Sequence, residues 1–415
     1  MKPVRIMLVA GETSGDALAA ELVEALRAAV TKRLGGPTAD LQPLSTGLAP
    51  EFFGAGGPRM ARVGVELVAD TTVHAVVGLS EVFRELGTYW RLFRQLLGLA
   101  ESRQPDVIIL VDSSGFNLRL AAALRRRVRA QRGSFGNWLP KIVYYVSPQV
   151  WASRPGRVLG MSRDLDLVLS IFPFEPRWYA ERAPGLRVVF VGHPLIDRHR
   201  QEGRNLRTGA EVRSIPLVLL LPGSRTQEVR RHLPVMVETI QTLIWKRAVR
   251  GRLVVPNDRM LWESRRYTAG VPDLETRIGG LEESLAEADV ALACSGTVTL
   301  ECAFYGVPTV VMYRTSWPTY LVARQVVQVR HIAMPNLLSG ERIYPELIQS
   351  EVTAENVARE ALDMLMDVER RVQMQQKLSG VVESLGLPGA TRRAAEAVVG
   401  LLENEGPELR AGLRG

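Results

Sequence analysis

Short apolar runs alternate with longer stretches of helical periodicity through the first half of the chain. The apolar runs occupy residues 4–10, 107–111, 142–146, 167–172 and 188–191. Between them, apolar side chains recur at helical spacing in residues 17–30, 81–97 and 118–129. Short runs of this kind are typical of strands buried on both faces of a parallel sheet. The alternation therefore predicts an α/β fold built from βαβ units.

The second half repeats this design after a polar segment, residues 197–214, which we interpret as a linker between domains. Apolar runs resume at residues 217–221, 252–255, 290–293 and 309–313, and a helical pattern fills residues 354–404. The sequence predicts two Rossmann-like, doubly wound domains that face each other across a cleft, the usual place for a ligand. We assign residues 1–200 to the N-terminal domain, 216–390 to the C-terminal domain and 391–415 to a C-terminal helical tail.

The most informative turn follows the apolar run 217–221. Pro222 and Gly223 end the run, and Ser224 and Arg225 lead into a helical pattern. Such a turn leaves backbone N–H groups free at the positive end of a helix dipole, where an anion binds favourably. The Arg225 guanidinium suits a phosphate. Gly223, Ser224 and Arg225 are therefore candidate phosphate ligands, and an ordinary turn with an exposed arginine is the alternative.

A second turn of the same design follows residues 290–293. Ser295, Gly296 and Thr297 are small and polar, and the helix that begins there carries Glu301. Ligands of open α/β sheets bind at the carboxyl ends of the strands, so two such turns can face one ligand. Glu301 is a candidate acceptor for ribose hydroxyls. Its alternative role is a solvated first-turn carboxylate that complements the helix dipole.

The length, the hydrophobic content and the cysteine count limit the classes of protein to which the chain can belong. With 415 residues, 46% of them hydrophobic, the chain can bury two cores. The N-terminus lacks the pattern of a signal peptide, and no stretch approaches the roughly 18 uncharged apolar residues of a membrane span. The two cysteines, Cys294 and Cys302, form no CxxC pair, which fits a reduced cytoplasm and argues against a zinc site.

The net charge of +8 raises the question of an anionic partner. A dense arginine cluster, residues 125–132, ends a predicted helix but lacks interleaved aromatic side chains. We interpret it as a solvated helix end, so that nucleic acid is not expected and an anionic membrane surface is the other candidate. Residues 81–97 and 317–330 combine aromatic and aliphatic side chains with arginines, as interfacial helices do. A helix that faces a core gives the same pattern.

Ten sequence blocks, in order, resemble the bacterial lipid-A-disaccharide synthase family. They are GETSGD (11–16), GAGGPRM (54–60), GLSEV (78–82), FNLRLA (116–121), YVSPQVWA (145–152), FPFE (172–175), VGHP (191–194), LLPGSR (220–225), SGTVTLE (295–301) and MPNLLSG (334–340). The resemblance extends from the start of the chain to about residue 340. It implies a glycosyltransferase of the GT-B type.

The resemblance also implies a reaction. A diacylated glucosamine passes from UDP-2,3-diacylglucosamine to 2,3-diacylglucosamine 1-phosphate, with inversion at the anomeric carbon and without a metal or cofactor. The products are a tetraacyl disaccharide 1-phosphate, in lipid A biosynthesis, and UDP. Members of the family are peripheral proteins on the inner face of the cytoplasmic membrane, and some form dimers. We therefore expect an anionic membrane surface as a partner, and the resemblance leaves a homodimer open.

Inverting transfer needs a base for the acceptor hydroxyl. Asp112 directly follows the apolar run 107–111, and it matches the first aspartate of the family's motif. We therefore expect Asp112 to be the base; a helix cap is the alternative. The family continues with Pro-Asp-Phe-Asn, whereas this chain has Ser114 and Gly115 before Phe116 and Asn117. That departure leaves the geometry of the turn open.

The remaining candidates are divided between the two substrates. The nucleotide sugar is assigned to Gly223, Ser224, Arg225, Ser295, Gly296, Thr297, Glu301 and Asn336, and the acceptor side to Glu12, Ser14, Asp16 and His193. Helix capping is the alternative for Ser14 and Asp16, and a turn is the alternative for Asn336 and His193. Two further patterns are discounted. Asp164 and Asp166 resemble a metal-binding DxD but precede a strand, and residues 54–57 lack GxGxxG spacing and an obvious preceding strand.

Three other functions remain open at this stage. A GT-B transferase with a different acceptor is one, and a nucleotide-sugar-binding protein without catalysis is the second. A nucleic-acid-binding protein is the third, and it rests only on the net charge. Retention of Asp112 and Arg225 argues against the second.

Overall fold

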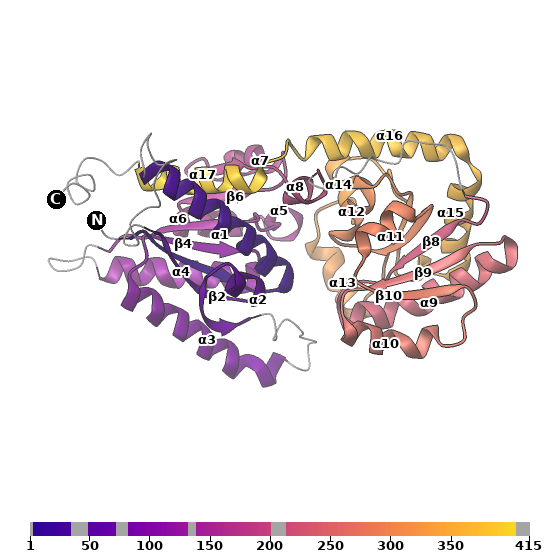
Figure 1. Ribbon diagram of the computed structural model, residues 1–415, viewed down its shortest axis with the longest axis horizontal. Helices are drawn as coiled ribbons and strands as arrows, with labels where there is room; N and C mark the ends of the chain where they lie inside the picture. The colour runs from indigo at the N-terminus through magenta and orange to yellow at the C-terminus, as the bar shows by residue number, and fades with distance from the viewer. Residues whose placement is uncertain (1–2, 35–48, 72–81, 132–137, 201–212, 404–415) are drawn as a thin grey trace. The chain divides into compact units, whose positions relative to one another are not determined.

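The computed structural model describes residues 3–34, 49–71, 82–131, 138–200 and 213–403. The chain forms two compact units. Unit 1 comprises Met1–Glu202 together with Leu385–Gly415, and unit 2 comprises Gly203–Ser384. Each unit is built on one parallel sheet with helices on both faces (Figure 1).

The sheet of unit 1 has the strand order β3-β2-β1-β4-β5-β6-β7, and all its strand pairs are parallel. Its strands are β1 (Arg5–Ala10), β2 (Glu51–Gly56), β3 (Glu66–Asp70), β4 (Val107–Val111), β5 (Lys141–Tyr145), β6 (Leu167–Ser170) and β7 (Val188–Phe190). Its helices are α1 (Thr13–Leu34), α2 (Pro58–Arg62), α3 (Val82–Arg103), α4 (Ser114–Ala130), α5 (Val150–Ser153), α6 (Arg157–Asp164), α7 (Glu175–Arg182), α8 (Pro194–Arg200) and α17 (Ala390–Glu403). The order reverses between β1 and β4, which marks the ligand position in a doubly wound sheet.

The sheet of unit 2 has the order β10-β9-β8-β11-β12-β13, again with parallel pairs. Its strands are β8 (Leu217–Leu221), β9 (Arg250–Val255), β10 (Leu274–Ile278), β11 (Val290–Cys294), β12 (Thr309–Tyr313) and β13 (Glu346–Ile348). Its helices are α9 (Thr226–Lys246), α10 (Asp258–Thr268), α11 (Leu281–Glu287), α12 (Val298–Phe304), α13 (Trp317–Val326), α14 (Met334–Ser339), α15 (Ala354–Met366) and α16 (Val368–Ser384). Here the order reverses between β8 and β11.

The predicted α/β architecture is confirmed, and the central strands fall where their apolar runs indicate. Every residue of β4, β8 and β11 is buried, as expected for strands covered by helices on both faces. Aliphatic side chains of these strands pack against the helices, for example Ile108 and Leu110 of β4 against Leu120 and Leu124 of α4. The helical pattern of residues 354–404 is divided into α15, α16 and α17 rather than forming one helix.

One expectation is wrong: a strand does accompany the glycines of residues 54–57. Gly54 and Gly56 lie in β2, which pairs with β1. Gly54 has φ +149°, and a Cβ atom there would collide with the carbonyl oxygen of Leu8. Glycine is therefore required because the two backbones approach closely at this point.

The end of the chain completes unit 1. Helix α17 packs against α1, α8 and β5, and Figure 1 shows α17 (yellow) beside α1 (indigo). The Asp197 carboxylate accepts hydrogen bonds from the backbone N–H groups of Gly389 (2.5 Å) and Thr391 (3.1 Å). Arg393 Nε donates to the Val191 carbonyl oxygen at 2.7 Å. Chain segments almost two hundred residues apart in sequence thus form one core.

A buried carboxylate lies in the FPFE block. Glu175 is fully buried, and it accepts hydrogen bonds from Trp151 Nε1 (2.9 Å) and the Ser170 hydroxyl (2.5 Å). Burial raises the pKa of Glu175 to about 7, although these hydrogen bonds oppose the shift.

The raised pKa of Glu175 predicts a pH dependence of stability. The unfolded chain ionises this carboxyl group near its ordinary pKa of about 4.5, whereas the folded chain resists ionisation until about pH 7. The contribution of this carboxyl group to stability is therefore fully present below pH 4.5 and is lost as the pH rises to about 7. We expect the free energy of unfolding of the wild type to fall by about 3 kcal/mol over this window relative to Glu175→Gln. Denaturant titrations of both proteins at pH 5, 6 and 8 check this, and parallel curves would contradict it.

Candidate active site

In unit 1, Asp112 lies directly after β4, beside the switch point of the sheet. Asp112 (φ 50°) and Ser113 (φ 47°) both adopt the left-handed conformation, which costs roughly 1–3 kcal/mol at a residue other than glycine. The Asp112 N–H donates to the Tyr145 carbonyl oxygen at 3.0 Å, and the Asp112 carbonyl oxygen accepts from Asn117 Nδ2 (2.9 Å) and the Tyr144 hydroxyl. These bonds hold a strained turn that presents a half-buried carboxylate at the carboxyl end of the strand.

The departure from the family motif falls on the start of a helix. Helix α4 begins at Ser114, so the family's proline and aspartate correspond to its first two positions. Proline and acidic residues are both favourable there, and a Cβ atom at Gly115 would meet nothing within 4 Å. An aspartate at position 115 therefore fits this backbone, whereas a proline at position 114 would disfavour the left-handed conformation that Ser113 adopts here.

Asn117 belongs to the FNLRLA block, but no role was predicted for it from the sequence. Its buried Nδ2 donates to the carbonyl oxygens of Val9 (3.4 Å) and Val111 (3.0 Å) as well as that of Asp112. It therefore ties together the ends of β1 and β4 on either side of the switch point. Its place directly after Phe116 in the FNLRLA block was the sequence feature that could have identified it.

The turn after β1 lies next to the Asp112 turn, because Ala10 pairs with Val111. A Cβ atom on Gly11 would come within 2.6 Å of the Ser113 side chain, so only glycine fits this contact. Glu12 is half-buried and Ser14 is exposed at this edge. Their assignment to the acceptor stays a prediction.

Asp16 lies in α1, but its carboxylate binds the N-terminus of a different helix, α2. Its buried carboxylate accepts the backbone N–H groups of Gly57 (2.8 Å), Met60 (3.0 Å) and Arg59 (3.0 Å). These groups lie at the N-terminus of α2, where the helix's first N–H groups need acceptors. Asp16 therefore joins the GETSGD and GAGGPRM blocks and positions the turn that carries Glu12.

His193 also has a local structural partner. Its Nδ1 accepts the Leu195 N–H at 3.1 Å, and its backbone N–H donates to the Leu385 carbonyl oxygen at 2.9 Å. Burial, and after it the nearby Arg198 charge, lowers the pKa of His193 to about 4. The imidazole is therefore neutral at pH 7 and holds the start of α8, whereas the backbone of His193 joins α8 to the segment that precedes α17.

In unit 2, the predicted phosphate turn already holds an anion. The Glu228 carboxylate accepts the N–H groups of Ser224 (2.9 Å) and Arg225 (3.1 Å), and Arg225 Nη1 donates to it at 3.2 Å. Gly223 has φ +111°, and a Cβ atom there would collide with Glu228. The turn thus has the donors expected of an anion site, and a carboxylate from the third position of α9 occupies part of it.

The turn after β11 lies beside this one, because Ala293 pairs with Leu221. Gly296 and Thr297 are exposed, and Glu301 is half-buried in the first turn of α12. The polar groups of Ser295 are hydrogen-bonded within the protein. Its N–H donates to the Met312 carbonyl oxygen (3.1 Å), and its hydroxyl donates to the Ile332 carbonyl oxygen (2.7 Å). The structure therefore brings the two predicted turns together and gives Ser295 a positioning role.

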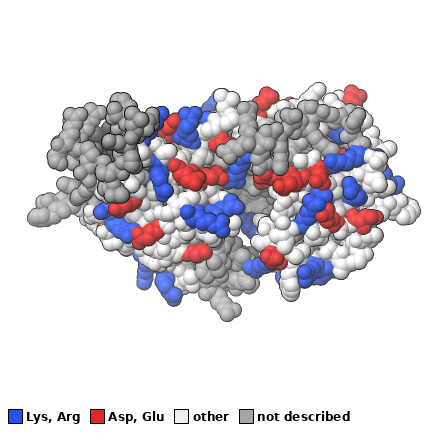
Figure 2. Space-filling view, in the orientation of Figure 1, with Lys and Arg blue, Asp and Glu red and all other residues white. Residues whose placement is uncertain are grey.

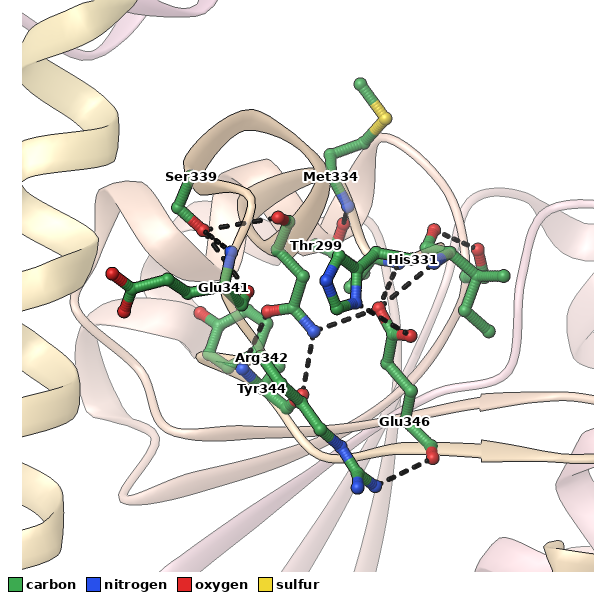
Figure 3. A network of polar contacts seen from close by, with 12 residues as sticks. Thr299, His331, Met334, Ser339, Glu341, Arg342, Tyr344 and Glu346 are labelled. Carbon is green, nitrogen blue, oxygen red and sulfur yellow. Dashed lines mark hydrogen bonds and ion pairs between the residues drawn. The ribbon is translucent and has the colours of Figure 1, made fainter. Parts of the chain in front are cut away.

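Asn336 is fully buried and forms a paired contact with Tyr344. Its Nδ2 donates to the Tyr344 carbonyl oxygen and its Oδ1 accepts the Tyr344 N–H, both at 2.8 Å. Nδ2 also donates to Glu346 (2.9 Å), whose carboxylate accepts the N–H groups of Ile332 and Ala333 as well. Figure 3 shows this network around the start of α14. Asn336 thus shapes the loop that contacts Ser295.

His232 is a positioning residue that the sequence analysis missed. Its buried ring accepts the Arg314 N–H at Nε2 (2.9 Å) and contacts the Glu228 carbonyl oxygen through Nδ1 (2.8 Å). Because Nε2 is the acceptor, Nδ1 carries the proton; burial lowers the pKa of this histidine. It links the phosphate turn to the end of β12. The one sequence feature that points to His232 is its position four residues, or about one helical turn, after Glu228.

Arginines of the cluster at residues 125–132 form ion pairs with carboxylates of the same protein. Arg125 pairs with Asp166 (2.5 Å) and Arg127 with Glu101 (2.5 Å). Asp166 also accepts the Ile142 N–H, so it is a structural residue, as its place before β6 suggested. In Figure 2, basic and acidic side chains are interspersed over the visible face rather than gathered into one basic surface. Within the described ranges, no group of three or more His, Cys, Asp or Glu side chains is placed to hold a metal ion.

The comparison with solved structures supports the fold. A UDP complex of MnaA from S. aureus has a TM-score of 0.60 at 12% identity, with 98% of this chain and 99% of that chain covered. The calicheamicin glycosyltransferase CalG4 has a TM-score of 0.53 at 16% identity, with 98% and 100% covered. At this identity the likeness shows the two-unit α/β architecture shared with GT-B glycosyltransferases.

The comparison of sequences identifies the family. The model described as lipid-A-disaccharide synthetase matches residues 6–399. The lipid-A-disaccharide synthase of Myxococcus xanthus is 38% identical over 408 residues, which cover 96% of this chain and 98% of that protein. That of Syntrophus aciditrophicus is 36% identical over 404 residues, with the same coverage. The chain therefore belongs to the lipid-A-disaccharide synthase family.

Proposed function

We propose that this protein is an inverting, UDP-sugar-dependent glycosyltransferase of lipid A biosynthesis. It joins UDP-2,3-diacylglucosamine to 2,3-diacylglucosamine 1-phosphate and releases UDP. The family match over residues 6–399 is the observation that carries this proposal. The two switch-point turns supply groups of the types that such a transfer requires.

The donor is assigned to unit 2. Its diphosphate is bound by Arg225 and by the N-terminus of α9, a helix of 21 residues whose dipole favours negative charge at this end. The same groups stabilise the charge of UDP as the glycosidic bond breaks. Gly296, Thr297 and Glu301, on the adjacent turn, contact the nucleoside. Ser295, Asn336 and His232 hold these two loops in place.

The acceptor is assigned to unit 1. The Asp112 carboxylate takes the proton from the 6-hydroxyl as that oxygen attacks the anomeric carbon. The left-handed turn fixes the carboxylate before substrate binds, so little reorganisation accompanies the proton transfer. Glu12 and Ser14 lie on the neighbouring turn and contact the same sugar.

One incubation tests the proposed function. The protein is supplied with both lipid sugars, and the products are identified by mass spectrometry. We expect the tetraacyl disaccharide 1-phosphate and one UDP per disaccharide, and no UDP release when either sugar is omitted. The resemblance implies transfer without a metal, so the same yield is expected in excess EDTA. Release of UDP only with a different acceptor would replace the assigned reaction.

Arg225→Ala is expected to weaken UDP binding by about 10- to 100-fold, the scale of a charged hydrogen bond. The side chain is exposed and its loss leaves the turn's backbone in place, so the fold is preserved. Titration calorimetry with UDP measures the effect. Arg247→Ala, at the opposite end of α9, is the matched control. Equal affinities for the two variants would remove Arg225 from the donor site.

We also propose peripheral attachment to the inner face of the cytoplasmic membrane. No helix in the described segments is long and apolar enough to span a bilayer. Helix α13 has no buried residue, and Trp317, Leu321 and Val322 are 59%, 56% and 62% exposed beside Arg324. Apolar side chains next to arginine suit the boundary between lipid headgroups and acyl chains. On α3, Trp90 is 57% exposed, whereas Phe93 packs against Phe116.

The membrane assignment predicts a selective loss of binding. Replacing Trp317, Leu321 and Val322 together with serine is expected to lower the bound fraction on phosphatidylglycerol vesicles by tenfold or more, because each removes about 1.5–3 kcal/mol of apolar transfer. The thermal melt is expected to stay unchanged, since none of the three is buried. Trp245→Ser, at an 85% exposed tryptophan of α9, is the control. Unaltered co-sedimentation of the triple variant would leave Trp90 as the next residue to replace.

A further inference from the structure

A cavity of about 780 Å³ lies in unit 1 beside the Asp112 turn. Its walls come from the start of α4, from α6 and from the segment after α7. Ser114 and Gly115, the two residues that follow the Asp112–Ser113 turn, form part of the lining. A ligand in this cavity therefore lies next to the proposed base, although none of the residues assigned above to either substrate lines it.

The polar part of the lining is strongly cationic. Four arginines and one aspartate line the cavity: Arg119, Arg157, Arg163, Arg182 and Asp164. In the part of the chain that the structure describes, no carboxylate pairs with Arg119 or Arg157. By contrast, Arg125 and Arg127 of the same helix α4 each have one. Two cations that face a cavity without a counter-ion indicate a site for an anion.

Electrostatics supports the closeness of these two arginines. Burial lowers the pKa of Arg157, and the neighbouring cations Arg154 and Arg119 lower it further. Burial raises the pKa of Tyr144, and the Arg157 charge opposes that shift. Since the Tyr144 hydroxyl donates to the Asp112 carbonyl oxygen, Arg157 lies within electrostatic range of the turn that carries the base. A bound dianion would relieve the repulsion between the arginines.

The remaining wall is apolar. Leu118, Ala122, Leu159 and Pro184 line it, and Leu159 is 63% exposed. An exposed leucine in the lining of a cationic cavity does not pack in the core. It provides a surface on which an acyl chain can lie while an attached phosphate reaches the arginines.

We propose that this cavity binds the phosphate of an acylated sugar phosphate, with Arg119 and Arg157 as the phosphate ligands and the wall of Leu118 and Leu159 as an acyl contact. The proposal rests on the proposed function, because it assigns the acceptor's 1-phosphate to this site. It explains how unit 1 recognises an acceptor that differs from the donor's sugar chiefly in carrying a free phosphate monoester.

The test combines loss of the arginines with loss of the phosphate. Arg119→Ala, Arg157→Ala and the double variant are assayed with 2,3-diacylglucosamine 1-phosphate and with 2,3-diacylglucosamine that lacks the phosphate. We expect each single variant to raise the KM for the phosphorylated acceptor by about 10- to 100-fold and to leave the KM for the UDP-sugar unchanged. The double variant is expected to use both acceptors with similar kcat/KM, whereas the wild type prefers the phosphorylated one.

Controls separate recognition from folding. Arg177→Ala removes an exposed arginine of α7 that pairs with Glu181 on the surface, and it is expected to behave as wild type. UDP affinity by calorimetry and the thermal melt report whether each variant is folded, and Arg157→Lys keeps the charge if Arg157→Ala does not fold. Inorganic phosphate is expected to compete with the acceptor in the wild type and to compete far more weakly in the double variant.

The outcomes are distinct. An unchanged acceptor KM in the folded double variant overturns the proposal, and so does an equal loss with both acceptors, since the arginines would then not contact the phosphate. If the wild type forms no disaccharide at all, the proposed function fails and not merely the site. If the wild type forms disaccharide but shows no preference for the phosphorylated acceptor, only the assignment of this cavity fails.

Discussion

Asp112→Asn is expected to lower kcat for disaccharide formation by about 10²- to 10⁴-fold, the usual contribution of a general base. The amide cannot take the proton of the acceptor hydroxyl, so the attacking oxygen stays a poor nucleophile. Asparagine tolerates the left-handed conformation that Asp112 adopts, so the turn is expected to persist. Single-turnover kinetics at saturating concentrations of both sugars isolates the chemical step.

Two measurements test whether a lower kcat reflects loss of the base rather than loss of donor binding or of the fold. UDP affinity is expected to match that of the wild type, because the donor groups lie on unit 2, and the thermal melt is expected to match as well. Asn117→Ala supplies a contrast: it keeps the carboxylate but removes the amide that holds the Asp112 carbonyl oxygen. We expect it to lower both kcat and the melting temperature. A kcat near that of the wild type in Asp112→Asn would show that another group is the base.

Val398→Asp is expected to destabilise unit 1 by about 3–5 kcal/mol and to lower its melting temperature by about 10 °C. Val398 lies on α17 with no exposed surface, in the helix that covers α1. An ionised carboxylate there loses its hydration without gaining a partner. Although the substitution is near the C-terminus, we expect the N-terminal half of the chain to unfold first.

Limited proteolysis with mass spectrometry locates that unfolding. New cleavage is expected within residues 3–200, whereas unit 2 is expected to keep its wild-type pattern. Glu396→Ala is the matched control, since Glu396 is on the same helix and pairs with Arg392 on the surface. Cleavage confined to unit 2 would contradict the division of the chain into these units.

Most of the strands that were predicted from the sequence are buried along most of their length, as β4, β8 and β12 are. The runs at 107–111, 217–221 and 309–313 match β4, β8 and β12 to the residue. β3 and β10 were missed because they lie at the edges of their sheets and carry charged residues such as Glu66 and Arg277. β2 was missed because its glycines, required for contact with β1, interrupt its apolar pattern. β13 has only three residues, too few for a periodicity.

The candidate site was predictable where it depends on position along a strand. Asp112, Gly223 and Ser295 follow buried strands, and the parallel sheets bring their turns together in pairs. The partners of these turns were not predictable. Glu228 and His232 act through hydrogen bonds whose geometry depends on how α9 packs, and the four arginines of the cavity come from three helices, α4, α6 and α7, that sequence alone does not place side by side.

The discontinuity of unit 1 has a consequence for synthesis of the protein. A ribosome that has finished Glu202 must still translate residues 203–384 before α17 can be made. At 5–20 residues per second this interval lasts roughly 10 to 40 seconds. Throughout it, the surface of α1 that α17 later covers lacks its partner. Unit 2 is complete before unit 1, so the nascent chain presents to chaperones an N-terminal unit whose α1 is not yet covered by α17.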